Sequence, residues 1–196
     1  NKMVENKTIL VTGGAGFIGS NLIRDLKKKN TVVSIDNYSS GKKSREYEGV
    51  TYFNLDCKNI FSLDKNFKPD IIYHLGEYSR VENSLKDPSK VFDNNIEGTY
   101  QVLKFSNEKK AKLIYAGSST KFGDNGSNRF ESPYAITKTI NTELVNNYCL
   151  WNKLDYAITY FYNVYGDGEN EEGEFATVIG IFKKLTRENQ SLTVVK

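Results

Sequence analysis

The sequence contains few of the residues that bind metals or form disulfides. Its 196 residues include one histidine, His74, and two cysteines, Cys57 and Cys149, which lie far apart in the chain. One histidine argues against a histidine-based metal site, and the cysteines lack the close spacing of metal ligands. Two distant cysteines also favour a reduced compartment over a disulfide framework. We therefore expect no bound metal and a cytoplasmic protein.

Long hydrophobic runs and a strong charge of one sign are also missing. No apolar run approaches the length of a membrane span, and no signal-peptide pattern precedes the first apolar segment. The formal net charge at pH 7 is +3, and the lysines are scattered rather than gathered in a stripe interleaved with aromatic residues. We therefore expect neither a membrane nor a nucleic acid as a partner.

Short apolar segments alternate with segments of helical periodicity along most of the chain. Such alternation predicts an α/β fold, a Rossmann-like doubly wound parallel sheet with helices on both faces. A chain of 196 residues suffices for one domain with a substantial core. The predicted strands span 8–11, 31–35, 50–55, 70–75, 112–116 and 156–161, and the predicted helices follow Gly16 and span 60–67, about 88–108 and 133–151.

The first predicted strand runs into a glycine-rich turn, Gly13-Gly14-Ala15-Gly16-Phe17-Ile18-Gly19, which opens a helix. A strand, turn and helix of this kind let the backbone approach a pyrophosphate and direct helix N–H groups at it. Glycine spacing alone is not specific, because a tight turn without a ligand also explains it.

Polar residues gather at the carboxyl ends of the predicted strands, outside which doubly wound sheets bind their ligands. Their convergence from six strands indicates a binding site more strongly than any one motif. These residues are Gly13 to Gly19, Asp36, Asp56, His74 to Glu77, Ser118 to Thr120, and Asn163.

Asp36 ends the second predicted strand, 20 residues after Gly16 (36 − 16). A carboxylate there can accept hydrogen bonds from adenosine ribose hydroxyls and would repel a 2′-phosphate, which favours NAD over NADP. The basic residues nearby, Lys42 to Arg45, weaken this inference, and a plain turn residue is the alternative. Asp56 is either an adenine contact or a helix cap. We expect His74 to be a hydrogen-bonded residue at a strand end.

Tyr134 and Lys138 begin the predicted helix that Pro133 opens, and the four-residue spacing places them on one helix face. The phenol of a free tyrosine has a reference pKa near 10, about three units too basic for a base at neutral pH. A neighbouring ammonium and the positive nicotinamide of NAD would stabilise the phenolate. Tyr134 would then take a proton from a substrate hydroxyl while Ser118 hydrogen-bonds the same oxygen.

The Tyr-x-x-x-Lys spacing is not specific by itself, because it occurs three times. It joins Tyr38 to Lys42, Tyr100 to Lys104, and Tyr134 to Lys138. Only the third pair stands at a helix start shortly after a strand that ends in hydroxyl residues. For the other two pairs we expect a tyrosine that packs beside a solvated lysine.

Together these motifs resemble the extended short-chain dehydrogenase/reductases, specifically the NAD-dependent epimerase/dehydratase family that acts on nucleotide sugars. The resemblance covers nearly the whole chain. It rests on residues 12–20, 36–41 and 56–57, on His74-Leu75-Gly76-Glu77 in place of the usual His-Leu-Ala-Ala, and on residues 94–99, 122–124 (Phe-Gly-Asp) and 162–166.

The resemblance implies a role for each matching residue. Catalysis falls to Ser118, Tyr134 and Lys138, and substrate binding to Ser118, Tyr134 and Asn163. The implied NAD-binding residues are Gly13, Gly16, Phe17, Ile18, Gly19, Asp36, Asn37, Ser39, Ser40, Asp56, Cys57, Leu75, Gly76, Glu77, Asn95, Tyr134, Lys138 and Tyr162. It also implies a homodimer formed through the helices at about 88–108 and 133–151.

Three departures from the family pattern stand out. Glu77 replaces a small residue and places a carboxylate near the nicotinamide or the sugar. Only 16 positions separate Ser118 from Tyr134 (134 − 118), so the loop over the sugar is short. The family normally continues for about another hundred residues, so we expect residues 1–196 to be an NAD-binding domain, with a substrate-binding part that begins near residue 163 and is mostly missing.

The family's 4,6-dehydratases carry an Asp-Glu pair directly after the catalytic hydroxyl residue, where this sequence has Ser119 and Thr120. The resemblance therefore favours an NAD-dependent epimerase, and a 4-epimerase in particular, acting on a UDP-, GDP- or ADP-linked sugar. A dehydratase or reductase of the same family, or a non-catalytic NAD-binding module, remains as an alternative.

Overall fold

A computed structural model of the protein describes residues 4–119, 122, 129–173 and 176–192. The chain divides into two compact units, Asn1–Tyr162 and Asn163–Lys196. The first unit holds the sheet and all but one of the helices described below.

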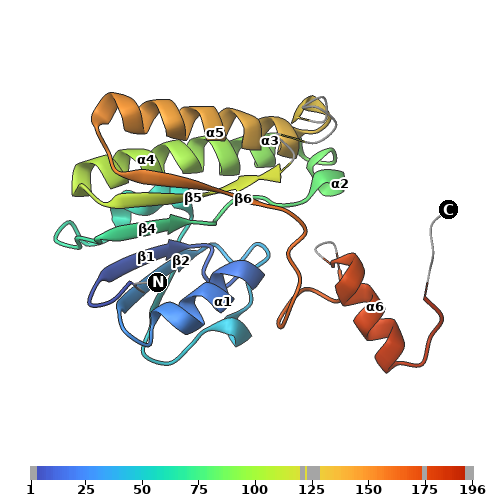
Figure 1. The fold of residues 1–196 in the computed structure, drawn as a ribbon. Coiled ribbons are helices and arrows are strands. Elements are labelled where there is room, and N and C mark those ends of the chain that lie inside the picture. Colours follow the sequence, from blue (N-terminus) through green and yellow to red (C-terminus); the bar gives the residue numbers. More distant parts are fainter. Residues whose placement is uncertain (1–3, 120–121, 123–128, 174–175, 193–196) are drawn as a thin grey trace. The chain divides into compact units, whose positions relative to one another are not determined.

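The first unit is built on a six-stranded parallel sheet with the order β3-β2-β1-β4-β5-β6 (Figure 1). Its strands are β1 (Thr8–Thr12), β2 (Thr31–Asp36), β3 (Thr51–Asn54), β4 (Ile71–His74), β5 (Lys112–Ser118) and β6 (Tyr156–Phe161). The strand order reverses direction between β1 and β4, which is where such sheets bind nucleotides. The predicted doubly wound α/β fold is confirmed.

Helices cover both faces of this sheet (Figure 1). Helix α1 (Phe17–Leu26) lies on one face, and α4 (Gly98–Lys109) and α5 (Pro133–Asn152) lie side by side on the other. Two shorter helices, α2 (Val81–Ser84) and α3 (Pro88–Phe92), precede α4. None of the described helices is both long and apolar enough to cross a membrane.

Two helix predictions need correction. The helix expected over 60–67 is instead a 3-10 helix over Cys57–Ser62, which Asp56 caps by accepting the Lys58 N–H at 2.9 Å. The cap begins the helix earlier than the apolar periodicity suggests. The helix expected over about 88–108 is divided into three consecutive parts. These are α3, then a π-helical turn over Asp93–Glu97, and then α4. Such π-turns within helices are frequent at functional sites.

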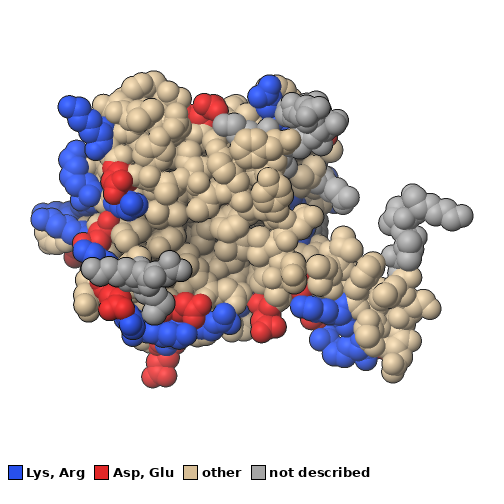
Figure 2. Space-filling model, in the orientation of Figure 1, with Lys and Arg blue, Asp and Glu red and all other residues tan. Residues whose placement is uncertain are grey.

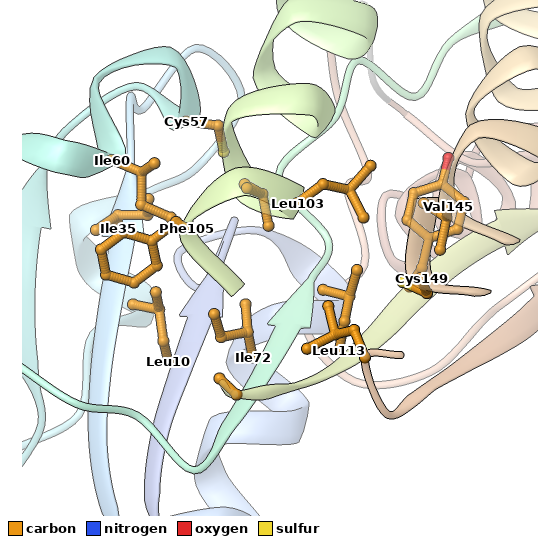
Figure 3. Packing of buried hydrophobic residues seen from close by; sticks show 14 of the residues in the cluster. Leu10, Ile35, Cys57, Ile60, Ile72, Leu103, Phe105, Leu113, Val145 and Cys149 are labelled. Carbon is orange, nitrogen blue, oxygen red and sulfur yellow. The ribbon is translucent and has the colours of Figure 1, made fainter. Parts of the chain in front are cut away.

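Apolar side chains from the sheet and its helices form a separate core on each face. On the α4/α5 face, Leu10, Ile72 and Leu113 of the sheet pack against Leu103 of α4 and Val145 of α5 (Figure 3). On the α1 face, Ile9, Val11 and Val32 pack against Ile23. Alternate residues of β1 thus point to opposite cores, as the two-residue strand period requires, and both cores fix the carboxyl ends of the strands in place.

The second unit contains one described helix, α6 (Val178–Arg187). Thr177 caps it by accepting the Gly180 N–H at 2.8 Å, and Glu169 accepts hydrogen bonds from the Thr177 hydroxyl and from Lys183, each at 2.6 Å.

In the first unit, basic and acidic side chains are interspersed at the edge of the face that Figure 2 shows.

Candidate active site

The glycine turn joins β1 to α1 with almost no space for side chains. Gly13 has a φ of +73°, and a methyl group on it would lie 2.9 Å from the Gly76 Cα. A methyl group on Gly19 would overlap the Gly13 carbonyl oxygen. Gly16 caps α1 without a side-chain hydrogen bond, so the first N–H groups of the helix, from Phe17 onward, are available to an anion.

Asp36 lies against this turn with its carboxylate buried. Its Oδ2 accepts the Ala15 N–H at 2.9 Å and its Oδ1 accepts the Tyr38 N–H at 2.8 Å. Burial raises the pKa of Asp36, and the two N–H groups offset only part of that effect. The structure thus places a hydrogen-bond acceptor beside the helix N-terminus, at the end of β2.

The neighbouring loop is held together by side-chain hydrogen bonds. Asn37 donates to Asp56 Oδ2 at 3.0 Å and accepts the Ser39 N–H at 3.0 Å. Asp56 is therefore a helix cap, as one of its two interpretations predicts, while its adenine contact stays a prediction. Cys57 is buried beside the Gly76 carbonyl oxygen, 3.6 Å from its Sγ, and burial raises the pKa of its thiol to about 12, so the thiol remains protonated.

The predicted catalytic residues meet at the ends of β5 and α5. Ser132 caps α5 by accepting the Ala135 N–H at 3.0 Å, which places Tyr134 in the first helical turn. The Tyr134 hydroxyl donates to Ser118 Oγ at 3.2 Å. One turn later, the buried Lys138 ammonium donates to the Ala116 carbonyl oxygen at 2.7 Å. The structure thus places Ser118 beside Tyr134, and the catalytic roles of these residues and of Lys138 stay predictions.

The Lys138 ammonium also forms a buried ion pair with Glu77. Only 2% of the Glu77 side chain is exposed. Burial alone would raise the pKa of Glu77, but the Lys138 ammonium and the donated hydrogen bonds outweigh it and lower the pKa. Three neutral donors complete the cage around the carboxylate: the hydroxyl of Thr99 at 2.6 Å, Asn141 Nδ2 at 2.6 Å, and the hydroxyl of Tyr115 at 3.1 and 3.2 Å.

His74 connects this cage to the glycine turn. Its Nδ1 lies 2.7 Å from Thr12 Oγ1, and its Nε2 lies 2.8 Å from Thr99 Oγ1. Because the Thr99 hydroxyl donates its proton to Glu77, we infer that Nε2 carries the imidazole hydrogen and that Nδ1 accepts from Thr12. Burial lowers the pKa of His74 to about 4, so the ring is neutral at pH 7. The prediction of a hydrogen-bonded strand-end histidine is confirmed.

We expect His74 to make the stability of the fold depend on pH. Between the unfolded pKa of 6.5 and the folded pKa of about 4, the unfolded state binds a proton that the folded state does not. The free energy of unfolding should therefore fall as the pH drops through this window, by about 2 kcal/mol between pH 7 and pH 5. Urea titrations from pH 7 to 5, above the ordinary carboxylate range, measure the fall. The single imidazole resonance should stay that of the neutral ring down to pH 5, and a titration near 6.5 would contradict this.

Further predicted cofactor residues lie in the loop after β4 and in the π-turn. The N–H groups of Leu75 and Gly76 donate to Thr12 Oγ1 at 3.1 and 2.9 Å. Asn95, in the π-turn, is fully buried and accepts the Tyr78 N–H at 2.7 Å while donating to Thr137 at 3.0 Å. Its amide therefore joins this loop to α5.

Other predicted residues lie at the boundary between the two units or outside the described residues. Tyr162 is 72% exposed at the end of the first unit, and Asn163 begins the second unit. Thr120, Gly123 and Asp124 lie outside the described residues. Among the residues that are described, no group of three or more His, Cys, Asp or Glu side chains could hold a metal ion.

The other two Tyr-x-x-x-Lys pairs have ordinary structural roles. Tyr38 donates to Glu46 at 2.5 Å in the loop after β2. On the exposed side of α4, the Lys104 ammonium lies over the ring of Tyr100, with its Nζ 5.6 Å from the ring centroid. Neither tyrosine stands next to the Ser118 hydroxyl.

Comparison with known proteins shows the family to which the chain belongs. A model of the NAD-dependent epimerase/dehydratase family matches residues 9–196. The chain belongs to this family. It is 32% identical, over 93% of its length, to a provisionally named UDP-glucose 4-epimerase of Methanocaldococcus jannaschii. It is 30% identical, over 96% of its length, to a UDP-N-acetyl-alpha-D-glucosaminuronate decarboxylase of Bacillus cytotoxicus.

The fold is also similar to solved structures of this family. The crystal structure of Thermus thermophilus UDP-glucose 4-epimerase in complex with NAD superposes with a TM-score of 0.84, at 27% identity and over 95% of this chain. The chain spans 64% of the length of both curated relatives and 65% of that structure. NAD is the cofactor of this family, which confirms the cofactor predicted from Asp36.

The residues of this chain fit NAD. The glycine turn is closely packed against the loop after β4, with no space for side chains at Gly13 and Gly19, and it leads directly into the N-terminus of α1, whose N–H groups can meet a pyrophosphate. The buried Asp36 carboxylate lies at the same turn, where it can accept from ribose hydroxyls.

Sequence reasoning missed the residues that surround Glu77. Thr99, Tyr115 and Asn141 come from α4, β5 and α5, and each donates a hydrogen bond to its carboxylate. Their one sequence signal is Glu77 itself, a carboxylate where the family pattern has a small residue. A buried carboxylate requires donors nearby, but only the fold shows which residues provide them.

Proposed function

We propose that this chain is the NAD-binding part of a nucleotide-sugar epimerase, with inversion at C4 of the sugar as the reaction. The supporting observation is the hydrogen bond from the Tyr134 hydroxyl to Ser118 Oγ, with the Lys138 ammonium one helical turn away. A tyrosine hydroxyl, a serine hydroxyl and a buried lysine are the groups that reversible oxidation of a sugar hydroxyl would use, in an epimerase or in another reaction of the same family.

In this proposal NAD, when bound, supplies a reversible hydride acceptor. Tyr134 accepts the proton of the sugar hydroxyl and later returns it, while Ser118 donates a hydrogen bond to the oxygen as it becomes a carbonyl. Lys138 provides positive charge that favours the phenolate form of the base. Inversion then requires the ketose to present its opposite face before the hydride and proton return.

The sequence after Ser118 supports an epimerase over a dehydratase. Elimination of water from the sugar needs an acid and a base, which the family's dehydratases carry directly after the catalytic hydroxyl residue. This chain has Ser119 and Thr120 there, and neither hydroxyl is an effective acid or base at neutral pH. A reductase and a non-catalytic NAD-binding module stay as alternatives.

The experiment is a product analysis by NMR. The full-length protein is incubated with NAD and, separately, with UDP-, GDP- and ADP-linked sugars, and we expect a C4 epimer of one of them without net NADH. A 4-keto-6-deoxy product would show that the protein is a dehydratase instead. Stoichiometric NADH would make it a dehydrogenase, and no turnover of any sugar would favour a binding module.

Homodimerisation through α4 and α5 stays a prediction. Both helices carry exposed apolar side chains, including Tyr100 on α4 and Ile140 on α5, which are 41% and 40% exposed.

A further inference from the structure

The proposed reaction assigns no role to Glu77, although its carboxylate is buried at the site. Only 2% of its side chain is exposed, and it forms an ion pair with the Lys138 ammonium. Taking two charges out of water costs free energy that their attraction offsets only with good geometry and further hydrogen bonds. Because a buried ion pair adds little net stability, its presence calls for an explanation in the contacts that it makes.

Hydrogen bonds from three elements fix the Glu77 carboxylate in place. Its Oε1 accepts from the Thr99 hydroxyl of α4 and from Asn141 Nδ2 of α5, each at 2.6 Å. The Tyr115 hydroxyl of β5 donates to its Oε2 at 3.1 Å. All three donor residues are fully buried. The carboxylate therefore cannot turn away from Lys138 without leaving buried donors unpaired.

The Lys138 ammonium is held at two points by this arrangement. It donates to Glu77 and to the Ala116 carbonyl oxygen of β5, the latter at 2.7 Å. Its Nζ also lies over the ring of Tyr115, 5.2 Å from the centroid. An ammonium has three N–H donors, and the described residues provide acceptors for two of them. The third N–H is left for an acceptor on a ligand.

The loop that carries Glu77 also contacts the glycine turn. Its neighbour Gly76 lies so close to Gly13 that a methyl group on Gly13 would be 2.9 Å from the Gly76 Cα. The Gly76 N–H donates to Thr12 Oγ1 at 2.9 Å. Lys138 is therefore bonded to the residue that directly follows the contact with the glycine turn.

The strand order places the ion pair on the side of the sheet opposite Asp36. A doubly wound sheet binds a dinucleotide across the point where the strand order reverses, here between β1 and β4. Asp36, the predicted ribose acceptor, ends β2 on one side of this point. Glu77 follows β4, and Lys138 is bonded to β5, on the other side. The second nucleoside half of NAD is thus expected beside the ion pair.

We propose that Glu77 is a positioning residue for cofactor binding, which holds the Lys138 ammonium ready to donate its third N–H to the second nucleoside half of NAD. Without the carboxylate, the ammonium would have to be ordered when NAD binds, at a cost in affinity. The inference rests on the NAD-binding part of the proposed function and on no step of the proposed epimerisation.

The test is calorimetric titration of the full-length protein with NAD and with ADP, which has the adenosine and the diphosphate but lacks the second nucleoside. Glu77→Gln keeps the size of the side chain and removes its charge. It should weaken NAD binding by about tenfold, the effect of one charge-assisted hydrogen bond, and leave ADP binding within about twofold of the parent. Glu108→Gln, the same change on α4 at a side chain that is 59% exposed, should alter neither affinity.

Unchanged NAD binding in Glu77→Gln would overturn the proposal. Tighter NAD binding would also overturn it, because Glu77 would then draw Lys138 away from the cofactor. So would an equal loss of affinity for NAD and ADP, which is the pattern of a residue that only maintains the fold. Since no turnover is measured, a failure of the proposed epimerisation leaves these results interpretable.

A second measurement decides the matter if Glu77→Gln does not fold. With the lysine side-chain nitrogens of the full-length parent isotopically labelled, a buried, hydrogen-bonded ammonium exchanges its protons slowly enough to give an NMR cross-peak. The cross-peak missing in Lys138→Arg belongs to Lys138. It should be present before any cofactor is added, and NAD should shift it while ADP does not. Its absence from the parent without cofactor, or equal shifts with NAD and ADP, would overturn the proposal.

Discussion

Replacing Tyr134 by phenylalanine should lower the rate of the proposed epimerisation by about 10³-fold, because the substitution removes the group that accepts the substrate proton. The change deletes one oxygen and the hydrogen bond to Ser118, and the ring keeps its place in the first turn of α5. NAD should therefore still bind. The rate is measured by following the epimeric sugar nucleotide, and NAD binding by calorimetry.

Tyr100→Phe is the matched control, since Tyr100 also stands four residues before a lysine, on the exposed side of α4. It should leave both the rate and NAD binding unchanged. Full activity in Tyr134→Phe would remove Tyr134 from the reaction and favour a non-catalytic module. Loss of NAD binding along with the rate would mean that Tyr134 acts in binding.

Replacing Gly19 by alanine should abolish NAD binding and destabilise the fold. A methyl group at Gly19 would overlap the Gly13 carbonyl oxygen, so the turn and the start of α1 would have to move apart. Overpacking of this kind costs about 3 kcal/mol in the free energy of unfolding, which denaturant titration measures. The displaced N–H groups of α1 would no longer meet a pyrophosphate, which calorimetry with NAD would report.

Gly49→Ala is the control for the loss of a glycine without overlap. Gly49 has a φ of +81°, and a methyl group there meets no atom within 4 Å. The variant should lose about 1 kcal/mol of stability to backbone strain and bind NAD normally. If Gly19→Ala bound NAD as tightly as the parent, the glycine turn would not be the pyrophosphate site.

The sheet and the proximity of Ser118 to Tyr134 were predictable from the sequence because local patterns determine them. Each strand is an apolar run that ends in polar residues, and parallel strands bring those ends to one edge. That topology was enough to predict that Ser118 and Tyr134, 16 positions apart, lie together. The cap that Asp56 forms was among the alternatives for the same reason, since a cap is a local feature.

The environment of Glu77 was not predictable because its hydrogen bonds join residues distant in the sequence. Its partners Thr99, Tyr115 and Lys138 lie 22, 38 and 61 positions away on three different elements. The π-turn over Asp93–Glu97 was equally hidden, because one extra residue in a turn hardly changes apolar periodicity. It lies where the buried Asn95 amide joins the loop after β4 to α5.

The central claim, that Ser118, Tyr134 and Lys138 serve an NAD-dependent epimerase, is tested most directly with a sugar nucleotide deuterated at C4. Product NMR follows the label in the full-length protein. We predict an inverted product that retains deuterium at C4, because the hydride returns to the carbon it left. Deuterium lost to solvent, or found at C6 of a 4-keto-6-deoxy sugar, would contradict this claim.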